Sequence, residues 1–215
     1  LVRSRGLGDV YKRQVNTNAV AGMLETKASS VTDMMKKLYD KDLVNYQKYQ
    51  GVTLTSKGLH FAKMIVRKHR LWEVFLVDKL GFQWDEVHEI AEELEHIKSE
   101  VLIQKLEEYL GFPMFDPHGD PIPSAAGEIK KINKLLLAEA ALNKDYQCIG
   151  VKDSSSEFLQ YLDKQKIALG SKITVIEKEP FDDTLLVKIN SRVISLSNKI
   201  AINLYVCLLY TSPSP

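Results

Sequence analysis

The sequence of 215 residues contains no apolar run that approaches the roughly 18 to 20 residues needed to cross a membrane. Its first residues also lack the charged, apolar and small-residue pattern of a secretory signal peptide. We therefore expect a soluble, cytoplasmic protein without a membrane partner.

An excess of charge of one sign is also absent. The chain has 29 Lys and Arg against 28 Asp and Glu, a formal net charge of +1. Such a balance neither requires nor excludes a nucleic-acid partner, because binding to nucleic acid depends on how the charges are distributed and not on their sum. The hydrophobic fraction of 45% and the charged fraction of 27% exclude a disordered chain, a collagen-like chain and a coiled-coil rod.

Cysteine is scarce. Cys148 and Cys207 lie far apart in the sequence and match no zinc-ligand or redox spacing. Two cysteines do not make a disulfide scaffold, so we interpret both as buried free thiols.

The two ends of the chain differ from the rest. Residues 1–14 have no clean helical or strand period, and residues 1–14 and 207–215 resemble peptides encoded by sequencing adapters. We therefore predict that both segments are non-native and exclude them from the fold prediction. The alternative is an irregular N-terminal arm and C-terminal tail.

Residues 15–58 carry the pattern of a helix, a turn, a second helix and a hairpin. Asn16 or Thr17 can cap a short first helix. In the second helix, apolar residues recur at the spacing of one buried face, i, i+3, i+4 and i+7: Val31, Met34, Met35 and Leu38. The pattern then changes to two short strands at residues 43–46 and 52–54. This order predicts a winged helix-turn-helix domain over residues 15–58.

Residues 59–127 form a second predicted domain, which is helical. The spacing of apolar residues predicts helices at 59–80, 84–97 and 99–110. Four prolines and two glycines between residues 113 and 127 then predict a loop.

Residues 128–206 form the third predicted domain. A helix at 128–141 opens it, and a second short helix follows at 156–164. Three alternating segments predict the strands of a small β-barrel: 172–178, 184–189 and 192–196. The whole chain is therefore predicted to be mainly α with small β parts, an α+β fold.

Imidazole and carboxylate side chains gather on two of the predicted helices. At about 100° per residue, four of them in the helix at 84–97 share an arc of about 100°, and two more lie four residues apart on the preceding helix. The six residues are His69, Glu73, His88, Glu92, Glu95 and His96. If the two helices pack antiparallel, the six converge. Imidazole and carboxylate ligands without a thiolate suit a site for Mn²⁺, Fe²⁺, Co²⁺ or Zn²⁺, and they differ from the cysteine-rich ligand set of a structural zinc site.

The same arc permits a simpler interpretation. The apolar residues of this segment lie roughly opposite it: Val87, Ile90, Leu94, Ile97 and Val101. The arc of histidines and glutamates is therefore also consistent with a solvated helix face. His60 and His118 have no partners at helical spacing, and we interpret each as a surface or loop histidine.

The helix that begins near Ser29 is suited to a DNA groove. Small polar residues at its N-terminal end can approach base edges, while lysines can meet phosphates and the hairpin can form a wing. The candidate DNA-binding residues are Lys27, Ser29, Ser30, Thr32, Lys36, Lys37 and Lys48. The alternative is an ordinary capped amphipathic helix with a solvated face.

An ordered set of short segments runs through residues 15–206. The main ones are Ser29-Ser30-Val31-Thr32, Leu54-Thr55-Ser56-Lys57-Gly58, Arg67-Lys68-His69-Arg70-Leu71, His88 with Glu92, Glu95 and His96, and Asp120-Pro121-Ile122-Pro123. Together they resemble the diphtheria-toxin-repressor-type metal-dependent transcriptional regulators. Residues 45–51 resemble the manganese-regulator branch of that family.

The resemblance implies a winged-helix domain, a helical dimerisation and metal domain, and a C-terminal SH3-like (FeoA-like) domain. It implies a homodimer that binds palindromic operator DNA when Mn²⁺ or Fe²⁺ is present and represses metal-uptake genes. Two metal sites per subunit are implied. Their ligands by position are His69, Glu73 and His88 for one site and Glu92, Glu95 and His96 for the other.

The resemblance also bears on which metal is bound. Iron-type members carry cysteine at position 92, so Glu92, a harder ligand, favours Mn²⁺. The family takes further ligands from its N-terminal helix, and none is identifiable in residues 1–14. A ligand from the third domain would lie near Ser154 or Glu157.

Two other functions compete with this one. In a metal-independent winged-helix regulator, the histidines and glutamates of the arc would only face the solvent. A dinuclear metallohydrolase would use the same cluster, but the sequence offers no nucleophile motif and no glycine-rich loop. We therefore predict that the protein is not an enzyme.

Overall fold

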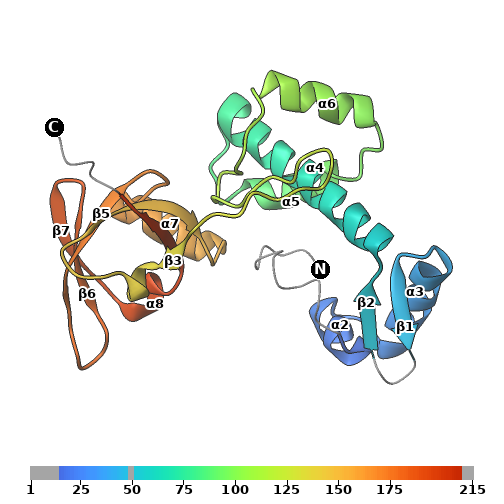
Figure 1. The fold of residues 1–215 in the computed structure, drawn as a ribbon, viewed down its shortest axis with the longest axis horizontal. Coiled ribbons are helices and arrows are strands. Elements are labelled where there is room, and N and C mark those ends of the chain that lie inside the picture. The colour runs from blue at the N-terminus through green and yellow to red at the C-terminus, as the bar shows by residue number, and fades with distance from the viewer. Residues whose placement is uncertain (1–14, 48–50, 210–215) are drawn as a thin grey trace. The chain divides into compact units, whose positions relative to one another are not determined.

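The computed structural model describes residues 15–47 and 51–209 (Figure 1). Two compact units divide the chain. One takes in the chain up to Lys68 together with Pro123–Glu128, and the other takes in His69–Ile122 and the chain from Ile129 onward. The predicted Lys48 and residues 1–14 lie outside the described residues. Among the described residues, no helix is both long and apolar enough to span a membrane.

The first unit holds two short helices and a hairpin, as predicted. Its elements are α2 (Thr17–Met23), α3 (Ala28–Asp40), β1 (Val44–Gln47) and β2 (Gly51–Leu54), shown in blue to cyan in Figure 1. Asn16 caps α2, since its side chain accepts a hydrogen bond of 2.7 Å from the Asn18 amide. A small core closes the unit: Val20, Ala21, Val31, Met35, Val44 and Val52. The helix-helix-hairpin prediction is confirmed.

Helix α4 (Ser56–Leu80) begins directly after the hairpin. Thr55 ties the first turn to the preceding loop, because its Oγ1 donates to the Asp42 carbonyl at 2.8 Å and accepts from the Gly58 amide at 2.9 Å. Gly58 lies against the Leu43 carbonyl so closely that an added Cβ would sit 1.8 Å from the oxygen. Only glycine fits there. The helix is continuous and contributes residues to both units.

The second unit begins with three helices around one apolar core. The latter part of α4 packs with α5 (Val87–Leu94) and α6 (Glu100–Tyr109). Their core comprises Leu71, Trp72, Val74, Leu76, Val87, Ala91, Ile103, Leu106 and Ile122. Helix α5 is shorter than the predicted 84–97, because residues 84–86 form turns and Glu95 already caps its end.

A six-stranded antiparallel sheet completes the second unit, in the order β3-β8-β4-β5-β6-β7. The strands are β3 (Leu135–Leu136), β4 (Asp145–Val151), β5 (Lys172–Lys178), β6 (Leu185–Ile189), β7 (Arg192–Leu196) and β8 (Leu204–Leu208). The helices α7 (Ser156–Gln165) and α8 (Asn198–Ala201) contribute to its core. The predicted strands and the helix at 156–164 are confirmed.

The prediction of a helix at residues 128–141 is wrong. Residues 129–134 have no regular structure, and β3 is followed by a single 3₁₀ turn, η1 (Leu137–Glu139). The apolar run here is used differently: Leu135 pairs with Val206 of β8, and Leu137 is fully buried in the sheet's core. Tertiary pairing therefore overrides the local helical pattern.

The cysteines are both free thiols, as predicted. Cys148 is buried, and burial raises the pKa of its thiol to about 11. Cys207 is only half-buried in β8, where it pairs with Gln147, so the prediction of a buried thiol is wrong for this residue. The non-native origin of residues 207–215 stays a prediction; residues 210–215 lie outside the described part of the chain.

Candidate metal centre

Helices α4 and α5 bring four of the six predicted ligands together. His69 Nε2 lies 3.0 Å from Glu73 Oε1, one turn along α4, and 3.1 Å from His88 Nδ1 on α5. His88 Nδ1 lies 3.5 Å from the same Glu73 oxygen. On the other side of the His69 ring, Nδ1 lies 2.8 Å from Glu95 Oε2. We call His69, Glu73 and His88 the helix group.

A second set of ligand atoms shares Glu73. Glu73, Asp116 and His118 each offer one ligand atom within 4.8 Å of the others, and all three residues are buried. His118 Nδ1 lies 3.8 Å from Glu73 Oε1. We call these three residues the loop group. Glu73 therefore stands between two candidate sites for a cation.

His118 was predicted to be a surface or loop histidine, and the structure confirms the loop but not the surface. It lies within the proline-rich loop as expected, but the residue is only 7% exposed, and its Nδ1 faces Glu73. Asp116 was not predicted at all. Neither residue lies at helical spacing from another ligand, so periodicity had no means of finding them. His60 is exposed, as predicted.

A buried arginine holds the loop that carries Asp116 and His118. Arg70 Nε lies 3.2 Å from Asp116 Oδ2, and its Nη2 lies 3.2 Å from Asp120 Oδ2. The same guanidinium donates to the Pro121 carbonyl. Asp116 Oδ1 in turn accepts from the backbone amides of His118 and Asp120, each at 2.9 Å. The loop is thus fixed from both sides of the Asp116 carboxylate.

The pKa values of the two loop-group carboxylates, Glu73 and Asp116, are shifted in opposite directions. Burial disfavours the charged form of Glu73, but hydrogen bonds from His69 and His88 outweigh it and hold the Glu73 pKa at about 2. Burial raises the pKa of Asp116 to about 7, and the charge of Glu73 adds to that rise while Arg70 opposes it. The loop group therefore places a second negative charge where the protein alone compensates it poorly.

Glu95 contacts the helix group without belonging to it. Both ring nitrogens of His69 face a carboxylate, Nδ1 that of Glu95 and Nε2 that of Glu73, and the ring donates to both only when it is protonated. A cation held at Nε2 would leave Nδ1 as the donor to Glu95. Burial alone would lower the pKa of His69, but the bonds and charges of Glu73 and Glu95 raise it. Carboxylates in this position commonly orient a metal-binding imidazole.

The structure does not bring Glu92 and His96 into either group. Both side chains are exposed, and within the described residues neither makes a hydrogen bond or ion pair. The predicted convergence of six residues is therefore seen for His69, Glu73, His88 and Glu95 only. A ligand role for Glu92 and His96 stays a prediction.

The candidate DNA-binding residues lie along the exposed side of α3. Lys27 precedes the helix as its N-cap residue, and Ser29 and Ser30 are exposed in the first turn. Thr32 Oγ1 donates back to the Ala28 carbonyl at 2.9 Å. Lys36 lies 3.6 Å from Asp33, and Lys37 occupies the last turn. Their contact with DNA stays a prediction.

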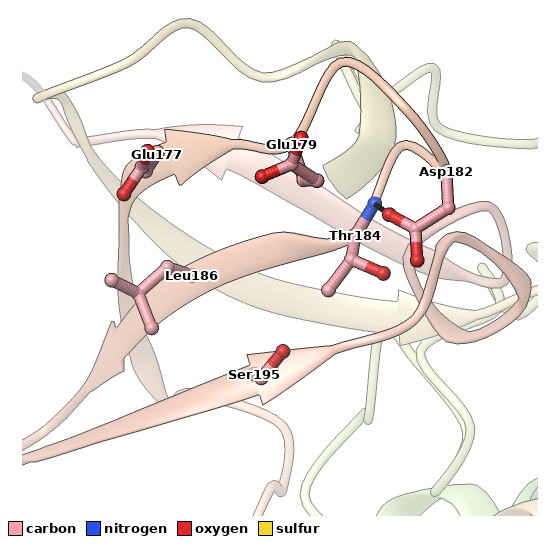
Figure 2. A pocket seen from close by; sticks show the side chains of 6 residues that line it. All are labelled: Glu177, Glu179, Asp182, Thr184, Leu186 and Ser195. Carbon is pink, nitrogen blue, oxygen red and sulfur yellow. Dashed lines mark hydrogen bonds between the residues drawn. The ribbon is translucent and has the colours of Figure 1, made fainter.

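A shallow pocket lies on the C-terminal sheet (Figure 2). Its lining comes from β5, β6, β7 and the loop between β5 and β6: Glu177, Glu179, Asp182, Thr184, Leu186 and Ser195. Asp182 is engaged locally, since its Oδ1 accepts from the Thr184 amide at 3.0 Å. The lining includes no histidine and no residue of either group, so the pocket is separate from the candidate metal centre.

Three family descriptions match successive parts of the chain. Residues 7–52 match "Iron dependent repressor, N-terminal DNA binding domain", and residues 55–124 match "Iron dependent repressor, metal binding and dimerisation domain". Residues 135–207 match "FeoA domain". The first match begins within the segment predicted to be non-native.

Curated relatives match about half of the chain. An uncharacterized HTH-type transcriptional regulator of Methanocaldococcus jannaschii is 40% identical over 98 residues, which is 46% of this chain and 78% of that protein. The iron-dependent repressor IdeR of Mycobacterium leprae is 36% identical over 104 residues, 48% of this chain. The match to IdeR spans about half of that protein, 45% of its length.

Solved structures match almost the whole chain. A manganese-dependent transcriptional repressor in complex with manganese is 33% identical, with a TM-score of 0.81 and 94% of both chains covered. ScaR with bound Cd²⁺ is 32% identical, with a TM-score of 0.74 and coverage of 92% of this chain and 93% of that one.

Proposed function

Because the chain belongs to the iron-dependent repressor family of metal-dependent transcriptional regulators, we propose that Mn²⁺ or Fe²⁺ is the metal that activates it for DNA binding. The activated form is a homodimer that binds a palindromic operator and represses metal-uptake genes. The family is one of repressors, not enzymes, so the metallohydrolase alternative is set aside.

The observation that carries this proposal is the pair of ligand groups that share Glu73. Both consist of imidazole and carboxylate only, which suits Mn²⁺ and Fe²⁺ and offers no thiolate to softer metals. The raised pKa of Asp116 supports a cation there, because a divalent ion would compensate the two facing carboxylates. His69, Glu73 and His88 would hold one ion, and Asp116 and His118 with Glu73 would hold another.

Exposed apolar side chains support a second copy of this chain as the partner. Six large ones lie on or next to α4 and α6 in the second unit: Leu80, Phe82, Val101, Leu102, Tyr109 and Phe112. Val101 and Tyr109 are 68% and 66% exposed. A dimer interface would remove this area from water, and the dimerisation description covers these residues.

Helix α3 is the proposed reading element. Its exposed N-terminal turn carries Ser29 and Ser30, and lysines lie at both of its ends. In a dimer, two copies of such a helix enter successive major grooves of a palindrome. Metal binding and operator binding are then linked, and each tightens the other by the same factor.

The test is selection of operator DNA from a random pool of duplexes under anaerobic conditions, with Mn²⁺, with Fe²⁺ and with chelator. The salt concentration is held constant, because phosphate contacts make DNA affinity depend strongly on salt. We expect a palindrome to be enriched only in the presence of metal. Enrichment with chelator would contradict the proposed metal activation, and a single asymmetric site would contradict the proposed dimer.

A further inference from the structure

Trp84 lies where the loop group meets the C-terminal sheet, within the second unit. Its carbonyl is 2.9 Å from His118 Nε2, and its ring is stacked on the His118 ring with 6.3 Å between centroids and 10° between planes. Its indole Nε1 donates to Asp163 Oδ2 on α7 at 2.9 Å. One residue therefore contacts a candidate ligand with its backbone and ring, and the C-terminal domain with its indole N–H.

The contact with the carbonyl decides which nitrogen of His118 is free to bind a cation. A carbonyl oxygen only accepts hydrogen bonds, so His118 carries its proton on Nε2. The lone pair of the neutral ring then lies on Nδ1, the atom that is 3.8 Å from Glu73 Oε1. A carbonyl that holds the second nitrogen of a metal-binding histidine fixes both the tautomer and the ring orientation.

Other contacts join the same point to the C-terminal domain. The Asp85 carbonyl accepts from Ser156 Oγ at 3.1 Å, and Asp85 Oδ2 accepts from Gln160 Nε2 at 2.8 Å. The His118 carbonyl accepts from the Val151 amide of β4 at 3.0 Å. His118 is thus held on one side by Trp84 and on the other by β4.

The loop that carries His118 lies so close to β4 that the two can move little relative to each other. Gly119 has a φ of +85°, and an added Cβ would lie 2.0 Å from the Ile149 carbonyl oxygen. Only glycine allows the loop to meet the strand here. A shift of α7 or β4 relative to this loop would therefore act directly on the orientation of His118.

We propose that Trp84 is a positioning residue that couples docking of the C-terminal domain to metal affinity at the loop group. The inference rests on the proposed role of His118 as a ligand. Docking orients Nδ1 of His118 toward Glu73 before the cation arrives. By linkage, a cation held at Nδ1 strengthens the docking of α7 and β4 in return.

The test measures Mn²⁺ binding to the full chain by equilibrium dialysis. Trp84→Leu removes the stacked ring and the indole donor, and Asp163→Ala removes only the acceptor. We expect each to weaken the loop-group Mn²⁺ by about tenfold, the low end of effects measured for outer-shell partners. Asp163→Asn keeps an oxygen that accepts from the indole, so its Mn²⁺ affinity should stay within about twofold of the wild type, since only a neutral hydrogen bond is needed there.

Quenching of Trp84 fluorescence by bound Mn²⁺ gives a second readout, because it reports whether the ion lies close to this residue. The chain has two tryptophans, so Trp72→Phe leaves Trp84 as the sole tryptophan, which is excited at wavelengths longer than those that tyrosine absorbs. Trp72 buries an indole N–H without a hydrogen-bond partner in the described chain, so this background change removes no hydrogen bond. Paramagnetic Mn²⁺ at the loop group should quench Trp84, and His118→Ala in this background should reduce the quenching to the part caused by an ion at the helix group.

The outcomes separate the two proposals. If His118→Ala loses one Mn²⁺ but Trp84→Leu and Asp163→Ala bind with wild-type affinity, Trp84 only packs the domain and the coupling is refuted while the metal site stands. If His118→Ala retains every Mn²⁺, the ligand assignment fails and the coupling fails with it. A tenfold loss in Asp163→Asn equal to that in Asp163→Ala would also overturn the role of the Trp84 hydrogen bond.

Discussion

The shared position of Glu73 makes Glu73→Gln the most informative single change. The substitution keeps the shape of the side chain and removes the charged oxygen that both groups use. At 3% exposure, Glu73 has no water to replace the lost interactions. We expect two separate consequences, one for the stability of the metal-free protein and one for metal binding.

The stability effect follows from the pKa. The fall of the Glu73 pKa from 4.5 to about 2 corresponds to about 3 kcal/mol of folding free energy at neutral pH. The amide of the variant can still hydrogen-bond the two imidazoles, so we expect a loss of about 1 to 3 kcal/mol. A carboxylate with a lowered pKa contributes fully above about pH 4.5, and the contribution is lost as the pH falls toward 2. The gap between wild type and variant should therefore narrow in acid.

Metal binding should fail at both groups in this variant. At a concentration of Mn²⁺ about 100-fold above the dissociation constant, each occupied site stabilises the wild type by about 2.7 kcal/mol. Glu73→Gln should lose most of this gain, whereas His88→Ala and His118→Ala should each lose only the part that belongs to one group.

The assay is denaturant unfolding with chelator and with Mn²⁺, combined with metal analysis after dialysis. For the stability in chelator, Glu92→Gln is the matched control, because it makes the same chemical change at an exposed carboxylate. Its stability in chelator should stay within about 0.5 kcal/mol of the wild type. Undiminished Mn²⁺ binding by Glu73→Gln, with loss in Glu92→Gln, would refute the placement of the metal at Glu73.

Three further changes test other parts of the centre. Mn²⁺ must displace the proton of Asp116, whose pKa is about 7, so Mn²⁺ affinity at the loop group should fall by up to about tenfold for each pH unit below 7. Equilibrium dialysis at pH 6 and pH 8 measures this fall, and Asp116→Asn should remove the part that comes from Asp116. Arg70→Gln leaves the buried Asp116 without its cation and Asp120 with Lys134 alone, at 4.0 Å, so thermal unfolding should show a loss of about 3 to 5 kcal/mol; a loss below 1 kcal/mol would contradict the ion-pair role. Glu92→Cys should shift preference from Mn²⁺ toward softer metals if Glu92 is a ligand, and an unchanged order of metal affinities would count against that role.

Local spacing accounts for the part of the centre on α4. His69 and Glu73 are four residues apart, so the helix alone brings their side chains to one face, and the observed separation is 3.0 Å. His88 and Glu95 lie on one arc of the next helical segment and both reach His69. Packing of α4 against α5 then made the contact that the sequence pattern anticipated.

The same spacing did not distinguish ligands from solvated residues on α5. Glu92 shares the arc with His88, yet it is exposed, and His96 lies past the end of the helix. Periodicity describes which residues share a face, but the angle at which another helix crosses that face decides which of them it meets. The helix predicted at 128–141 failed for a related reason, since pairing with β8 captured its apolar residues.

The sequence by itself determined the order of the domains, the helix-helix-hairpin unit, the strands of the C-terminal sheet and the chemistry of the helix group. These depend on contacts between residues close along the chain, which leave a period in the sequence. Only the tertiary structure decided that Asp116 and His118 join Glu73, that Arg70 holds their loop and that Trp84 orients His118. Those contacts join residues 34 to 51 positions apart, and such distant partners leave no period.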